Sequence, residues 1–142
     1  MNHITNDNKI ILRIDRGEYI NKTILDVANF YNLKFGWING IGAIMDPELG
    51  YYDLEKKEYV KKKIAGDFEL TSLVGNITLK DNNLFVHSHI TFSDINFNAY
   101  GGHLFDCKIA VAGEFVISKS PMKIDRRYDE EVGLYTWSCN ID

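Results

Sequence analysis

The stretch Phe85-Val86-His87-Ser88-His89-Ile90-Thr91-Phe92 is rich in aromatic and β-branched residues, a composition typical of a β-strand. Side chains two positions apart on a strand point to the same face, about 6.5–7 Å apart along the chain. His87 and His89 are therefore expected side by side, as two ligands of one metal ion must be. The alternative is that they are two ordinary polar residues on a solvent-facing strand.

Short strand-like runs separated by turn residues fill most of the remaining chain. One amphipathic helix interrupts them, because apolar residues recur every three to four positions between Tyr19 and Tyr31. Asn32 supplies its C-terminal stop. One helix among many strands predicts an α+β fold, a mostly antiparallel β-sheet with the helix packed on it. Strands are expected at 9–15, 35–39, 49–53, 58–64, 68–77, 84–92 and 108–118, with breaks at Gly40/Gly42 and Gly101-Gly102.

Two segments fit this pattern less well. The segment between Asp94 and Asp106 is predicted to hold a second short helix. The tail, residues 122–142, mixes charged and aromatic side chains. It is expected to dock on the domain or on a neighbouring subunit rather than trail free.

Length and composition limit the class of protein. The 142 residues predict a single domain spanning 1–142. With 45% hydrophobic and 25% charged residues, the domain can form a core without disulfides, so Cys107 and Cys139 are expected to be free thiols in a reducing compartment. No apolar run is long enough for a membrane span, and the polar N-terminus lacks the core of an export signal. A cytoplasmic location is therefore expected.

His103 could complete a metal site with the first two histidines. It follows Gly101-Gly102, a pair that lets the backbone bend and approach another segment closely. Three neutral imidazoles with one open position are the pattern of a catalytic-type zinc site. The ligand types alone would also suit nickel, copper or iron, so Zn²⁺ is expected but not dictated.

These motifs together resemble the plants-and-prokaryotes-conserved (PPC) domain, a family whose bacterial members are often labelled PD1-like DNA-binding proteins. Glu114 on a late strand and Arg127 near the tail also fit the family. The resemblance covers about residues 9–137. It is carried by residues 66–77, His87-Ser88-His89 and Gly101-Gly102-His103-Leu104, with support from Leu12-Arg13-Ile14, Gly40-Ile41-Gly42-Ala43 and Leu49-Gly50-Tyr51-Tyr52-Asp53.

The resemblance implies an α+β fold assembled as a homotrimer and a metal site at His87, His89 and His103. It also implies a fold similar to that of acetolactate decarboxylase, a zinc enzyme that uses three histidines. It does not specify a biochemical activity for bacterial members that consist of this domain alone.

DNA is a partner by the family label, but the residues give it little support. Plant members carry Arg-Gly-Arg-Pro cores that enter the minor groove, and this sequence has none. Asp67 and Thr71 replace two residues of the plant element that recruits partner proteins. The net charge of −4 also argues against non-specific DNA binding. The lysine-rich run 56–63 is interpreted as a solvated edge strand, with phosphate contacts as the alternative.

Three functions remain open. The first is a trimeric binding module that holds a metal and takes a small ligand or another protein. The second is a metal-dependent enzyme acting on a small anionic substrate as a lyase, a decarboxylase or a hydrolase. The third is DNA binding through Lys61–Lys63. For the enzyme, the candidate proton-transfer groups are Glu69, Glu114 and Asp94, and the candidate carboxylate clamps are Arg13 and Arg127; five aromatic residues could shape its pocket, namely Tyr51, Tyr52, Phe92, Phe97 and Tyr100.

Overall fold

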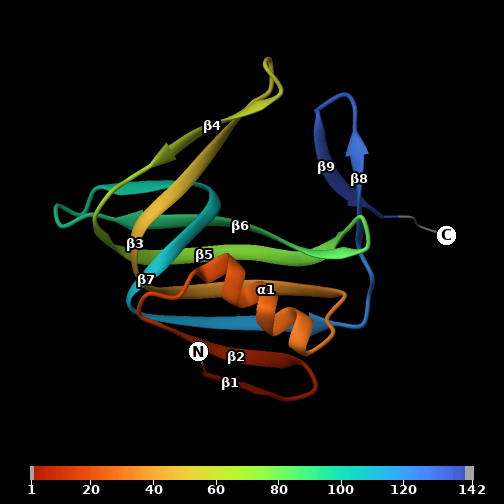
Figure 1. Ribbon diagram of the computed structural model, residues 1–142, viewed down its shortest axis with the longest axis horizontal. Coiled ribbons are helices and arrows are strands. Elements are labelled where there is room, and N and C mark those ends of the chain that lie inside the picture. Colours follow the sequence, from red (N-terminus) through yellow and green to blue (C-terminus); the bar gives the residue numbers. More distant parts are fainter. Residues whose placement is uncertain (1, 140–142) are drawn as a thin grey trace.

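The computed structural model describes residues 2–139, and in this part of the chain strands dominate (Figure 1). The α+β prediction is confirmed. The single helix of the described residues has 11 residues, and no helix there is long and apolar enough to cross a membrane. The elements in chain order are β1 (Asn2–Thr5), β2 (Lys9–Asp15), α1 (Ile20–Phe30), β3 (Phe35–Asp53), β4 (Glu58–Lys63), β5 (Asp67–Lys80), β6 (Asn83–Ser93), β7 (Ala99–Ser120), β8 (Asp125–Asp129) and β9 (Leu134–Ser138).

The strands form one sheet in the order β1-β2-β7-β3-β5-β8-β9, with β4 beside β3. Strand β6 pairs with both β5 and β7. Because β3 also pairs with β5 and β7, these four strands make a closed cycle of hydrogen-bonded neighbours. All pairings are antiparallel except the short β5–β8 contact. Strands β6 and β7 form a hairpin in which Ala99–His103 of β7 pairs with His89–Ser93 of β6.

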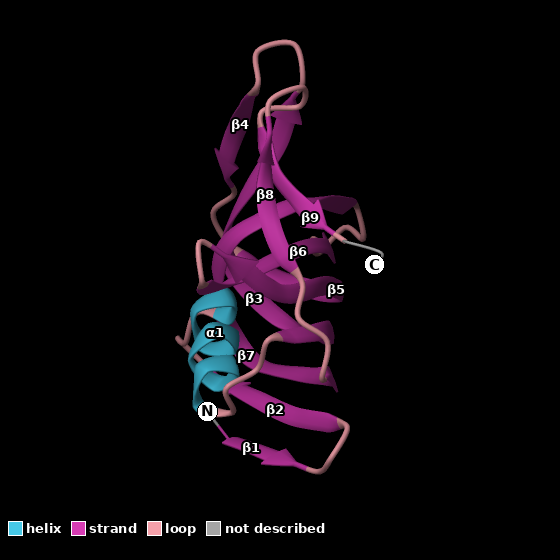
Figure 2. Cartoon of the chain, turned by 90° about the vertical axis from the view of Figure 1, so that its right-hand side faces the viewer, coloured by secondary structure: helices cyan, strands magenta, loops and turns pink. Residues whose placement is uncertain are grey.

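Helix α1 packs against one side of the sheet (Figure 2). Its buried stripe includes Ile20, Ile24 and Val27, at the predicted three-to-four-residue spacing. The predicted stop at Asn32 is confirmed, since this residue has a φ of 51° directly after the helix. Tyr19 at the N-cap position makes no side-chain cap, and Asp106 of β7 instead accepts a hydrogen bond from the N–H of Asn21 at 3.0 Å. The helix start is thus fixed to β7 close to His103.

The second helix predicted between Asp94 and Asp106 is wrong. A tight turn occupies this place, and β7 begins at Ala99. The Asp94 carboxylate organises the turn by accepting hydrogen bonds from the N–H groups of Asn96 and Asn98 and from the Tyr100 hydroxyl. Because a short Asp side chain can accept hydrogen bonds from nearby backbone N–H groups, it favours a turn over a helix interior.

The strand breaks predicted at the glycine pairs are also wrong, because β3 runs through Gly40 and Gly42 and β7 runs through Gly101-Gly102. The pairing of β3 with β5 shifts register between Gly40 and Gly42, which is a bulge inside a continuous strand. The tail was predicted to dock, and its β8–β9 hairpin does so through β5.

Candidate metal centre

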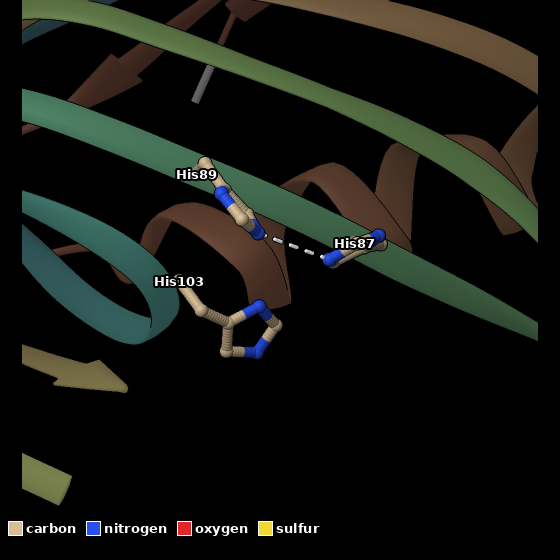
Figure 3. A group of neighbouring side chains, drawn as sticks. All are labelled: His87, His89 and His103. Atoms are coloured by element: carbon tan, nitrogen blue, oxygen red, sulfur yellow. Dashed lines mark hydrogen bonds between the residues drawn. The ribbon is translucent and has the colours of Figure 1, made fainter. Parts of the chain in front are cut away.

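His87, His89 and His103 come together across the β6–β7 pairing. His87 and His89 lie on one face of β6, and His103 of β7 is the direct cross-strand partner of His89. Ser88, between the first two, points to the other face and donates a hydrogen bond to Asn21 of α1 at 2.8 Å. The strand period predicted from the sequence therefore places the two imidazoles together (Figure 3).

Glycines allow the strands that carry the histidines to approach closely. A Cβ on Gly75 of β5 would lie 2.6 Å from the carbonyl oxygen of His87. A Cβ on Gly101 of β7 would lie 2.8 Å from the carbonyl oxygen of Ile90. Both separations are below ordinary van der Waals contact, so only glycine fits there without a shift of the backbone.

The ring nitrogens converge on a space of metal-ion size. One ligand nitrogen from each histidine lies within 4.8 Å of the other two. The Nε2 atoms of His87 and His89 are 3.2 Å apart. Two ligands of a tetrahedral Zn²⁺, each about 2.0–2.1 Å from the ion, lie about 3.3 Å apart. The Nδ1 atom of His103 is buried and has no hydrogen-bond partner among residues 2–139. Figure 3 shows a ring nitrogen of His103 facing the other two imidazoles.

Burial keeps two of the three imidazoles neutral. Desolvation, with smaller contributions from Arg126 and the neighbouring histidines, lowers the pKa of His87 to about 4. Desolvation, His89, Arg126 and Lys61 lower the pKa of His103 to about 4. Neutral imidazole is the form that binds a metal. The chemistry of the donor set and the orphaned Nδ1 atom therefore both fit a metal ion.

The same shifts predict how stability depends on pH in the metal-free protein. With EDTA present, we expect the free energy of unfolding to fall as the pH drops from 6.5, the ordinary value for histidine, towards about 4. In this window the unfolded chain takes up protons that the folded chain does not, so acid favours unfolding. Urea unfolding at pH 7.5, 6 and 5 measures this loss. A His87→Asn/His103→Asn variant should lose less stability over the same range, and an equal loss would contradict the assignment.

Comparison with known families places the fold. The model of the Plants and Prokaryotes Conserved domain, abbreviated PCC or PPC, matches residues 1–121. The chain belongs to the PPC domain family. A comparison with curated proteins returned no match.

Three solved structures resemble this PPC protein over nearly its whole length. A proposed DNA-binding protein from Bacteroides thetaiotaomicron is 30% identical, with 96% of each chain covered and a TM-score of 0.93. A PPC protein from Pyrococcus horikoshii is 32% identical, with 96% of this chain and 98% of that chain covered and a TM-score of 0.86. A metal-containing protein from Archaeoglobus fulgidus is 35% identical, with 92% of each chain covered and a TM-score of 0.85. Acetolactate decarboxylase from Bacillus subtilis aligns only distantly, at a TM-score of 0.48.

A cavity of about 660 Å³ in the PPC protein opens beside His87 and His103. Helix α1, strands β6 and β7 and the β8–β9 hairpin supply its walls. Tyr59 also lines it, with its ring centroid 5.0 Å from that of His103. Aliphatic, aromatic and basic side chains share the wall; the aromatic and basic ones are Tyr59, Phe85, Phe105, Tyr128 and Tyr135, with Lys22, Lys80 and Arg126. None of the five aromatic residues proposed from the sequence is among the residues that line it.

Arg126 is the functional candidate that the sequence reasoning missed. Only 8% of it is exposed, and its guanidinium reaches the site, with Nη2 3.3 Å from Nδ1 of His87. The neighbouring Arg127, chosen from the sequence, is exposed and does not line the cavity. Nothing in the local sequence distinguishes the two arginines. The pairing of β8 with β5 and β9 determines which of them faces the cavity.

The other candidates lie away from the three histidines. Glu69 is exposed and lines a separate cavity with Asp94. Glu114 and Arg13 line a third cavity, at the β2, β3 and β7 strands. Of the acidic residues in the described part of the chain, only Asp106 lines the cavity beside the histidines. The predicted free thiols are found, with Cys107 buried and Cys139 exposed; burial raises the pKa of the Cys107 thiol, which makes it a poor nucleophile.

Proposed function

We propose that this PPC protein binds one divalent metal ion, Zn²⁺ by preference, through His87, His89 and His103. The buried Nδ1 atom of His103 carries the proposal, because a buried ring nitrogen without a partner normally costs stability and a metal would satisfy it. The 3.2 Å separation of the His87 and His89 Nε2 atoms supports the same geometry. A homologue at 35% identity is named as a metal-containing protein.

Metal binding should be visible as a gain in stability. Protein prepared without chelators is expected to contain about one metal ion per chain. Adding Zn²⁺ to the EDTA-treated and dialysed protein should raise its Tm, because a ligand held at 100 times its Kd stabilises the folded state by about 2.7 kcal/mol. Elemental analysis and differential scanning calorimetry measure the two quantities. An unchanged Tm and a metal content near zero would refute the proposal.

A binding module fits the cavity better than an enzyme does. When bound, Zn²⁺ would polarise a carbonyl group or lower the pKa of a bound water. The chain would then have to move a proton, and Asp106 is the acidic residue nearest to that role. Its Oδ1 atom already accepts hydrogen bonds from the N–H groups of Asn21 and Cys107, which commits it to the helix start. A metal-dependent lyase, decarboxylase or hydrolase acting on a small anion is the second candidate, favoured by the basic wall of the cavity.

DNA binding gains less from the structure. Strand β4 carries Lys61, Lys62 and Lys63 and, among the described strands, pairs only with β3, as the predicted edge strand does. The Lys61 ammonium lies 4.0 Å from the centre of the Phe105 ring, so this cation already has a partner. The lysines therefore fit a protected sheet edge. DNA is still a partner to test, because a homologue is described as a proposed DNA-binding protein.

A homotrimer is part of the proposal. The turn between β6 and β7 presents Ile95 and Phe97, which are 91% and 89% exposed. A separate, largely apolar hollow of about 650 Å³ is lined by Ile11, Ile41 and Val116. Contacts between two unlike surfaces of identical chains form a ring when the rotation from one copy to the next closes, and the proposal is that it closes after three copies. Sedimentation velocity should give the mass of three chains for the wild type and a smaller mass for Phe97→Asp. A monomeric wild type at micromolar concentration would refute the trimer.

A further inference from the structure

Arg126 is a buried cation without an anionic partner among the described residues. Its guanidinium donates hydrogen bonds to Thr78 Oγ1 at 2.8 Å, to the Tyr135 carbonyl oxygen at 3.0 Å and to Asn76 Oδ1 at 3.0 Å. All of these acceptors are neutral, as is the His87 ring nitrogen beside it. Buried charges in proteins are normally paired with opposite charges, so this arrangement leaves a positive charge for a ligand to balance.

The hydrogen-bond pattern gives the tautomer of His87. A guanidinium can only donate, so Nδ1 of His87 accepts from Arg126 and the ring proton lies on Nε2, which faces Nε2 of His89. A metal on Nε2 of His87 would move that proton to Nδ1. Two donors, His87 Nδ1–H and Arg126 Nη2–H, would then face each other 3.3 Å apart. Such a pair requires an acceptor, and a negatively charged one fits it best.

The remaining walls of the cavity suit an anion with an apolar body. The Lys80 ammonium lies 4.0 Å from the centre of the Tyr135 ring. The Asp106 carboxylate is the one acidic group among the described residues that line the cavity, and it accepts hydrogen bonds from backbone N–H groups at 3.0 Å and 2.9 Å. The aromatic wall around these groups would cover a flat or apolar molecule. Three basic side chains, Lys22, Lys80 and Arg126, thus line this cavity beside a single carboxylate.

The geometry points to a small organic carboxylate as the ligand of this cavity, its carboxylate held by Arg126 and by the Nδ1–H of metal-bound His87, its body against the aromatic wall. This inference rests on the proposed metal site. It also predicts that the two ligands bind cooperatively, because the anion offsets the repulsion between Arg126 and the metal ion. The metal ion and the carboxylate must then increase each other's affinity by the same factor.

The test compares benzoate with benzamide, a neutral molecule of the same shape, by isothermal titration calorimetry. The Zn²⁺-loaded wild type should bind benzoate at least about tenfold more tightly than benzamide. In Arg126→Gln this preference should disappear, while Zn²⁺ alone binds at least as tightly as in the wild type, because a positive charge beside the metal is gone. Arg126→Lys keeps the positive charge but loses the paired N–H donors of the guanidinium, so it should show an intermediate preference for benzoate. Arg127→Gln is the matched control and should behave as the wild type.

The outcomes separate the two proposals. If the wild type binds Zn²⁺ but shows no preference for benzoate, or if Arg126→Gln keeps the preference, the carboxylate site is wrong and the metal site stands. If no Zn²⁺ binds, the metal proposal fails. The metal-free titration then decides the carboxylate site, since Arg126 alone should still favour benzoate over benzamide, and equal binding of the two molecules overturns it.

Discussion

Replacing His89 with alanine is expected to lower the affinity of the protein for Zn²⁺ by more than about 100-fold. Removing a residue that only orients a metal ligand typically costs 10–100-fold in affinity, and removing a ligand should cost more. His89 is the right residue to change because its side chain is exposed, so the substitution should leave the fold intact. Competition with a chromophoric chelator at pH 7.5 measures the affinity.

The matched control for this substitution is His3→Ala. His3 lies in β1, and its Nδ1 atom contacts the Tyr31 hydroxyl at 2.8 Å, away from the candidate metal centre. This variant should bind Zn²⁺ as the wild type does, which excludes non-specific binding by surface histidines. His89→Ala and His3→Ala with the same Zn²⁺ affinity would show that the three histidines are not the ligands.

The three histidines could be predicted from the sequence because two local rules decide them. The strand period sets His87 and His89 on one face, and this rule needs no tertiary information. Gly101-Gly102 before His103 indicated close approach of the backbone, which is observed, although the pair lies within β7 and not at a break. A glycine pair in the sequence signals backbone freedom, and the partner strands decide whether it becomes a turn or a tightly paired strand.

The role of Arg126 could not be predicted, because it depends on pairing between distant segments. Arg126 and Arg127 are adjacent on a five-residue strand, so they point to opposite faces. The parallel pairing of β8 with β5, at Leu79 and Lys80, together with its pairing to β9, turns Arg126 towards the site. A shift of one residue in that register would exchange the two arginines. For the same reason the aromatic residues of the cavity wall, which come from five separate strands, could not be recognised from the sequence.

The second large effect is expected at Gly40, in the middle of β3. Gly40 pairs with Phe115 of β7, whose side chain is only 1% exposed. A Cβ on Gly40 would lie 2.0 Å from Cδ1 of the Phe115 ring, far inside van der Waals contact. The ring is fixed by the core around it and cannot move aside without opening a void elsewhere. Gly40→Ala should therefore lower the free energy of unfolding by about 3 kcal/mol or more, measured by urea unfolding.

The cause of this loss can be separated from a general intolerance of β3 to substitution. Phe115→Leu alone should destabilise the protein, because it leaves a cavity in the core. Combined with Gly40→Ala, the smaller side chain makes room for the new methyl group, so the double variant should be more stable than the sum of the two losses predicts. Strictly additive losses would mean that the Phe115 ring is not what excludes a side chain at position 40. The bulge beside it, where Gly42 has a φ of 155°, would then be the constraint to examine by substitution.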